Sequence, residues 1–104
     1  MIKIGTDIVY IPRMEKSIDS QSFCQRVFTK AENDYCKTPQ QYAGIFAAKE
    51  AYFKAKGTGL RFPLTDLQVL HDEAGKPYFD GIEKCDLSIS HDGDYAVASV
   101  VVWE

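Results

Sequence analysis

The chain has few cysteines and none in a metal-binding spacing. Its three cysteines, Cys24, Cys36 and Cys85, are odd in number and far apart, so they indicate neither a zinc site nor a disulfide framework. Free cysteine usually behaves as a small buried hydrophobic residue. We therefore expect three structural thiols and a cytoplasmic protein.

Other features are also lacking, and each lack argues against a class of function. No apolar run approaches the roughly 18 residues that span a bilayer. Asp7 lies where a signal peptide would be apolar, so we expect neither a membrane span nor a secretion signal. The net charge is −3 and no five basic residues are consecutive, so general nucleic-acid binding is not expected.

The composition is that of a small globular protein. Of the 104 residues, 45% are hydrophobic and 12% aromatic, which is enough for one core, and there is no internal repeat or linker. We expect a single domain over residues 1–104.

The first third of the chain shows one strand and two short helical segments. Ile2–Tyr10 alternates in polarity and predicts a strand, which Pro12 should end. Arg13–Ser22 predicts a short helix or loop. Thr29 and Glu32 have the spacing of a capping box that opens a second short helix.

A long central helix has clear ends. Thr38 is placed as the N-cap, Pro39 as the first helical residue and Gln41 as the third, while Gly57 supplies a left-handed C-cap. The helix should be about 17 residues long, or roughly 26 Å. Its many alanines allow it to pack closely on a sheet.

The last forty residues predict strands joined by tight turns. The expected strands are Asp66–His71, Pro77–Phe79, Asp86–Ser90 and Tyr95–Trp103. The sequence Asp92-Gly93 is a hairpin signal between the last two. The fold class is therefore α+β, with one long central helix and short helices packed on an antiparallel sheet that the N-terminal strand joins.

The central helix is apolar almost all round, yet it carries Glu50 and Lys54 one turn apart. On a helical wheel of about 100° per residue, Phe46, Phe53 and Lys54 lie within roughly 60° of Glu50. Charges on an apolar face cost free energy to desolvate. Either the two groups neutralise each other or they act on a charged ligand.

Two further features could act with this pair. Asp7 lies in the first strand near Gly5, and the Gly57-Thr58-Gly59 turn has cationic neighbours. These cations are Lys49, Lys54, Lys56 and Arg61. Two carboxylates and several cations suggest Mg²⁺ bridging to a phosphorylated ligand. The turn is not a P-loop, because its glycines end a helix instead of opening one.

Each signal also has an ordinary structural interpretation. Asp7 could cap a turn, Glu50 and Lys54 could form a solvated helix-face pair, and Gly57 could simply stop the helix. His91, at a strand end, could be structural or could contact a phosphate or a base.

Taken together, these pieces resemble the small bacterial holo-acyl-carrier-protein synthases, a family of 4′-phosphopantetheinyl transferases. The matching segments run in the family's order: Ile4-Gly-Thr-Asp-Ile8, Thr29-x-x-Glu32, Ala43-Gly-x-Phe-Ala-Ala-Lys-Glu-Ala51, Lys54, Gly57-Thr-Gly59, Gly75-Lys-Pro77 and Leu87-Ser-Ile-Ser-His91. The block around Glu50 is highly specific, whereas the terminal pieces are weak alone.

The resemblance implies transfer of the phosphopantetheine arm of coenzyme A to a serine of acyl carrier protein, releasing adenosine 3′,5′-bisphosphate. It implies Mg²⁺ held by Asp7 and Glu50, with Lys54 at the leaving phosphate. It leaves open whether Glu50 or a metal-bound water takes the serine proton.

The resemblance also implies contacts beyond the metal. Coenzyme A would meet Lys54, Gly57, Thr58, Gly59, Lys76, Pro77 and His91. Arg13 matches an arginine that meets the acidic carrier helix, and Arg26 is a second candidate for carrier binding. The family forms trimers with active sites between subunits, so a homotrimer is expected.

Three departures from the family pattern stand out. Ile45 replaces a usual arginine, and the loop near Lys37 is shorter and less basic. Both changes remove cations near coenzyme A, and Lys49, Lys56 or Arg61 could compensate.

Because Ser17–Ser22 is also less basic, the partner could be a specialised polyketide or peptide-synthesis carrier. The pattern is also compatible with a degenerate binding module without turnover, or with a purely structural trimer subunit.

Overall fold

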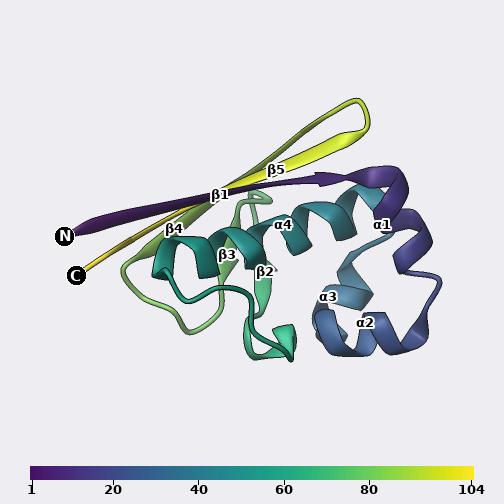
Figure 1. Ribbon diagram of the computed structural model, residues 1–104, viewed down its shortest axis with the longest axis horizontal. Helices are drawn as coiled ribbons and strands as arrows, with labels where there is room; N and C mark the ends of the chain where they lie inside the picture. Colours follow the sequence, from purple (N-terminus) through teal and green to yellow (C-terminus); the bar gives the residue numbers. More distant parts are fainter.

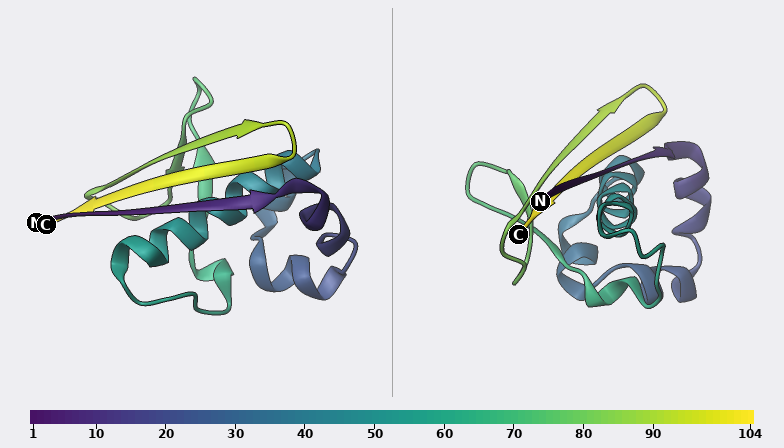
Figure 2. Two further views of the ribbon diagram at one scale, coloured as in Figure 1. Left: turned by 45° about the horizontal axis from the view of Figure 1, so that its top comes forward. Right: turned by 60° about the vertical axis from the view of Figure 1, so that its left-hand side comes forward.

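A long helix lies between a three-stranded sheet and a group of short helices. The computed structural model describes all residues from 1 to 104. Figure 1 shows the helix α4 (Pro39–Lys56) beneath the sheet, with α1 (Ile11–Ser17), α2 (Gln21–Val27) and α3 (Lys30–Tyr35) grouped at one end of the molecule. Seen along α4, the sheet and the short helices lie on opposite sides of it (Figure 2).

The main sheet is antiparallel, with β1 (Ile2–Tyr10) and β4 (Cys85–Asp92) flanking β5 (Tyr95–Trp103). The register pairs Ile2 with Trp103 and Tyr10 with Tyr95, so the two ends of the chain lie together. A separate antiparallel pair is formed by β2 (Val69–His71) and β3 (Pro77–Phe79). The expected α+β class is confirmed.

Small residues let α4 approach the sheet closely. Five alanines of α4 are buried against the sheet and the short helices. They are Ala43, Ala47, Ala48, Ala51 and Ala55. A Cβ atom on Gly5 of β1 would collide with the Ala51 carbonyl oxygen and come within 2.6 Å of the Ala55 nitrogen. Gly5 is therefore required for the distance between β1 and α4.

The ends of α4 are those expected from the sequence. The Gln41 N–H donates to Thr38 Oγ1, and the Gln41 side chain caps the Thr38 N–H in return. Gly57 ends the helix in the left-handed conformation with φ of 72°. The helix has 18 residues, one more than expected. None of the helices has the length and apolar composition of a bilayer-spanning segment.

Several expected boundaries were wrong. The strand β1 has the expected bounds and ends before Pro12, but Pro12 lies in the first turn of α1, where proline is tolerated because that N–H has no helical partner. Instead of one short helix or loop, residues 11–27 form the two helices α1 and α2. The expected strand Asp66–His71 is shorter, because Leu64–Asp66 forms a 3₁₀ turn, η1, and β2 begins only at Val69.

Candidate active site

Asp7 and Glu50 are brought together by the packing of β1 on α4. Asp7 points toward the helix and is 8% exposed, while Glu50 is partly buried. Both line a cavity of about 260 Å³, whose wall also includes Phe46 of α4 and Arg13 of α1. The sequence placed the two carboxyl groups in one candidate site, and the structure brings them into one cavity.

Lys54 pairs with Asp7 and not with Glu50. Its Nζ lies 2.9 Å from Asp7 Oδ1 and 3.0 Å from the carbonyl oxygen of Thr6. The interpretation of Glu50 and Lys54 as a mutually neutralising pair is therefore wrong. Asp7 Oδ2 is buried and has no hydrogen-bond partner, so this carboxyl group keeps one unused acceptor at the cavity.

Glu50 is held in an environment that disfavours its charge. Burial, followed by the negative charge of Asp7, raises the pKa of Glu50 to about 7, and Lys54 only partly opposes this. Two adjacent carboxyl groups resist simultaneous ionisation unless a cation lies between them. Glu50 therefore suits either a proton acceptor or a ligand of a cation.

The donor set fits Mg²⁺ with a phosphorylated ligand. No cluster of three His, Cys, Asp or Glu side chains is arranged to hold a metal ion. Mg²⁺ commonly takes only one or two protein carboxylates and completes its shell with water and phosphate oxygens. Asp7, whose Oδ2 has no partner, and Glu50 are the two carboxyl groups that line the cavity.

None of the expected coenzyme A residues lines this cavity, although Lys54 adjoins it through its ion pair with Asp7. Pro77 and His91 line a second cavity of about 260 Å³, together with Gly75 and Ile45. Around the axis of α4, Ile45 lies roughly 140° from Glu50, so the two cavities open on different sides of the helix. Gly57, Thr58 and Gly59 are exposed and lie outside both cavities.

Lys76 is tied to the sheet instead of projecting freely. Its Nζ lies 2.8 Å from Asp86 Oδ1 and 3.1 Å from the Leu87 carbonyl oxygen. Hydrogen bonding to this ammonium group lowers the pKa of Asp86. Lys76 lines a third cavity, on the outer face of the sheet, with Pro77.

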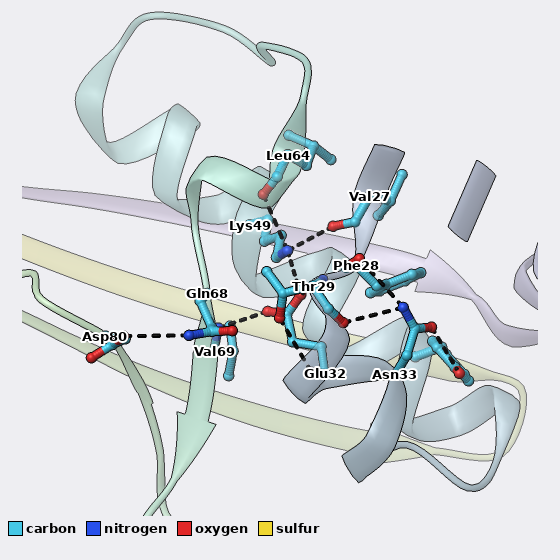
Figure 3. A network of polar contacts seen from close by, with 11 residues as sticks. Val27, Phe28, Thr29, Glu32, Asn33, Lys49, Leu64, Gln68, Val69 and Asp80 are labelled. Carbon is cyan, nitrogen blue, oxygen red and sulfur yellow. Dashed lines mark hydrogen bonds and ion pairs between the residues drawn. The ribbon is translucent and has the colours of Figure 1, made fainter. Parts of the chain in front are cut away.

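Lys49 is structural and cannot compensate for Ile45. Its ammonium group is fully buried and lies 2.6 Å from Glu32 Oε1, 2.6 Å from the Val27 carbonyl and 3.1 Å from the Leu64 carbonyl (Figure 3). All three ammonium protons are therefore used inside the protein. The expectation that Lys49 could serve the ligand is wrong.

Glu32 completes this buried network. Besides Lys49, it accepts hydrogen bonds from the N–H groups of Thr29 and Val69, at 2.8 and 2.7 Å (Figure 3). The capping box expected from Thr29 and Glu32 is thus confirmed. Its further role, joining α3, α4 and β2, had no local signal in the sequence.

The two arginines expected at the carrier lie in different places. Arg13 lines the cavity with Asp7 and Glu50, and its guanidinium group is 5.8 Å from the centre of the Tyr10 ring. Arg26 lies outside that cavity and over Phe62, at 5.7 Å. Only Arg13 adjoins the carboxyl groups.

Comparison with known proteins shows the family of the chain. The model of the 4′-phosphopantetheinyl transferase superfamily matches residues 3–100. The chain belongs to this superfamily and is an enzyme of that class. Among curated relatives, the holo-[acyl-carrier-protein] synthase of Fusobacterium nucleatum is 41% identical and aligns over 98% of each chain. The synthase of a Wolbachia endosymbiont of Drosophila simulans is also 41% identical, over 95% of each chain.

Solved structures show the same fold. A holo-(acyl-carrier-protein) synthase from Bacillus anthracis, in complex with CoA (3′,5′-ADP), has a TM-score of 0.85 and 39% identity, covering 95% of this chain and 93% of its own. The synthase from Helicobacter pylori, in complex with coenzyme A, has a TM-score of 0.84 and 32% identity, covering 95% and 97%.

Proposed function

We propose that the chain, as one domain over residues 1–104, transfers the 4′-phosphopantetheine arm of coenzyme A to a serine of apo acyl carrier protein. The observation that carries this proposal is that Asp7 and Glu50 line one cavity while Lys54 pairs with Asp7. Adenosine 3′,5′-bisphosphate would be the other product.

Asp7 and Glu50 would hold Mg²⁺ together with oxygens of the coenzyme A pyrophosphate. Bound there, the metal would neutralise phosphate charge and make the phosphorus more electrophilic. The fit rests on the unpartnered Asp7 Oδ2 and on the raised pKa of Glu50.

The protein's own groups would then handle the proton and the leaving charge. The carrier serine must lose its proton as it attacks phosphorus. Glu50, which lines the cavity, would be that acceptor, and a water beside it is the alternative. The ammonium group of Lys54, oriented by Asp7 and the Thr6 carbonyl, would stabilise the leaving phosphate.

The proposal includes a homotrimer with active sites between subunits. The outer face of the sheet exposes Ile2, Ile4 and Ile8, which are 74%, 71% and 61% exposed. Such exposed apolar side chains on one face are typical of a surface that another protein covers. Assembly through it would also account for the two cavities on different sides of α4, because neighbouring chains could each supply one.

The acidic carrier would approach over Arg13, beside the carboxyl groups. Arg26, on α2, would add a second contact at a greater distance from the chemistry. The cytoplasmic location expected from the free cysteines is part of the same proposal.

One specific observation favours a second candidate, a coenzyme A-binding module without turnover. Ile45 lines the cavity of His91, and no lysine or arginine lines that cavity. The deciding experiment incubates the purified protein with coenzyme A, Mg²⁺ and a panel of apo carrier proteins, alongside Ile45→Arg. Mass spectrometry should show a carrier gaining one phosphopantetheine arm. Coenzyme A binding without any such gain would replace the enzyme proposal with the binding module.

A further inference from the structure

Both histidines of the chain line the same cavity. His71 comes from β2 and His91 from β4, and the cavity of about 260 Å³ also includes Tyr35, Gln40 and Ile45. None of its ten lining residues is Asp, Glu, Lys or Arg. The two imidazoles are therefore the only lining side chains that can carry a positive charge near neutral pH.

The side chain of His71 is held by an aromatic stack. Its ring lies 3.8 Å from the Tyr35 ring, centre to centre, and the two planes differ by 7°. The stack covers one face of the His71 ring, so the nitrogen atoms at the ring edge stay available. His91 Nε2 lies 3.0 Å from Gln40 Nε2, whereas His71 makes no side-chain hydrogen bond within the protein.

The surroundings of His71 can accept an anion. Burial lowers the pKa of His71, and the carboxylates of Asp72 and Glu32 act in the opposite direction. Tyr35 faces it from α3, and His91 is the titratable group contributed by β4. No carboxylate lines the cavity itself, so an entering anion would not be repelled there.

The amino end of α4 adds to this preference. Gln40 and Gln41, in the first turn of an 18-residue helix, line the cavity. The first turn of a helix carries a partial positive charge that favours anions.

We propose that His71, braced by Tyr35, binds a phosphate group of coenzyme A in this cavity together with His91. The inference rests on the proposed function and deepens it by assigning a ligand residue at a position that no sequence motif marked. His71 would carry the proton that Ile45, an aliphatic neighbour in the same cavity, cannot. Phosphate binding would thus take up a proton and strengthen as pH falls from 8 to 6.

The test measures binding of adenosine 3′,5′-bisphosphate to the purified full chain by calorimetry at pH 6, 7 and 8. Two buffers of different ionisation enthalpy give the number of protons taken up. His71→Asn should weaken binding about tenfold at pH 6, as expected for a lost charge-assisted hydrogen bond, and less at pH 8. It should also reduce the proton uptake.

Four further variants separate the charge of His71 from the packing around it. His71→Gln repeats the test if His71→Asn unfolds, as judged by thermal denaturation. Tyr35→Phe keeps the stack and should bind like the wild type, whereas Tyr35→Ala should weaken binding. Tyr78→Phe, on the neighbouring strand β3 and outside the cavity, is the matched control and should change nothing.

The same binding measurements with adenosine 5′-monophosphate and with inorganic phosphate show which phosphate group of the bisphosphate His71 contacts. A loss confined to the bisphosphate assigns His71 to the phosphate on the ribose 3′ position. An equal loss with the monophosphate assigns it to the 5′ side, and both results support the proposal. Unchanged affinity and proton uptake in the folded histidine variants would overturn it while leaving an active transferase intact. Failure of the wild type to bind the bisphosphate, with no transfer to any carrier, would overturn both proposals.

Discussion

The Lys54 ammonium group lies 2.9 Å from Asp7 Oδ1, although the two residues are 47 positions apart. Glu50 is one helical turn from Lys54 and is left without this partner. The ion pair therefore fixes one carboxylate and leaves the other with a raised pKa. This division of roles between two adjacent acids underlies the proposed chemistry.

Glu50→Gln should abolish phosphopantetheine transfer while preserving the fold. The amide keeps the size of the side chain but can neither accept the serine proton nor hold a cation as a carboxylate does. Transfer is measured by carrier mass, and folding by thermal denaturation. Glu73→Gln, an exposed acid outside the cavity, serves as the control. A normal rate in Glu50→Gln would remove Glu50 from the mechanism.

The metal-free protein should lose stability as pH rises toward neutrality. Because burial and then Asp7 raise the pKa of Glu50 from 4.5 to about 7, the folded state retains a proton that the unfolded chain has released in this range. The free energy of unfolding therefore falls between about pH 4.5 and 7. Urea denaturation in the presence of a chelator measures this slope. Glu50→Gln should flatten it, and an equally steep slope in this variant would assign the titration to other groups.

Lys49→Met should destabilise the protein by about 3–5 kcal/mol, because it leaves the buried Glu32 carboxylate without its cation. Adding Glu32→Gln, which removes the charge but keeps an acceptor for Thr29 and Val69, should recover part of the loss. Chemical denaturation gives both values.

A matched control for the buried pair is available on α3. Lys30 forms a similar pair with Asp34 at 2.8 Å, but both side chains are exposed. Lys30→Met should change stability far less than Lys49→Met. Similar effects of the two substitutions would contradict the assignment of a structural role to burial of Lys49.

Ile4→Glu or Ile8→Glu should dissociate the proposed trimer. Either change places a carboxylate on the exposed apolar face of the edge strand β1, where burial against another chain would desolvate it. Light scattering after size-exclusion chromatography measures the mass. Leu60→Glu makes the same change at an exposed apolar residue outside the sheet, and should leave the assembly unchanged. A monomeric wild type would refute the assembly itself.

The ends of α4 could be predicted because the signals are local. Thr38, Pro39 and Gln41 act within one turn, and Gly57 needs only its own backbone conformation. The helix α2 was missed, although Ser20 accepts a hydrogen bond from the Phe23 N–H as an N-cap. Its short length, seven residues, left too little periodicity to separate it from α1.

The composition of the site was only partly predictable. Asp7 and Glu50 were found because each is an acid in an apolar pattern. The partners of Lys49 and Lys54 were not, because they lie 15 to 48 residues away and depend on tertiary packing. On a helix that is apolar all round, the sequence cannot tell which lysine enters the core.

The placement of the two cavities on different sides of α4 bears on how defective chains would behave in mixtures. In the proposed ring, each active site takes its carboxyl groups from one chain and its histidines from the next. A Glu50→Gln chain and a His91→Ala chain, each inactive alone, would then restore some intact sites when co-assembled. Such complementation would show that each active site is shared by two chains. A chain with one altered residue would then impair only the site to which it contributes that residue.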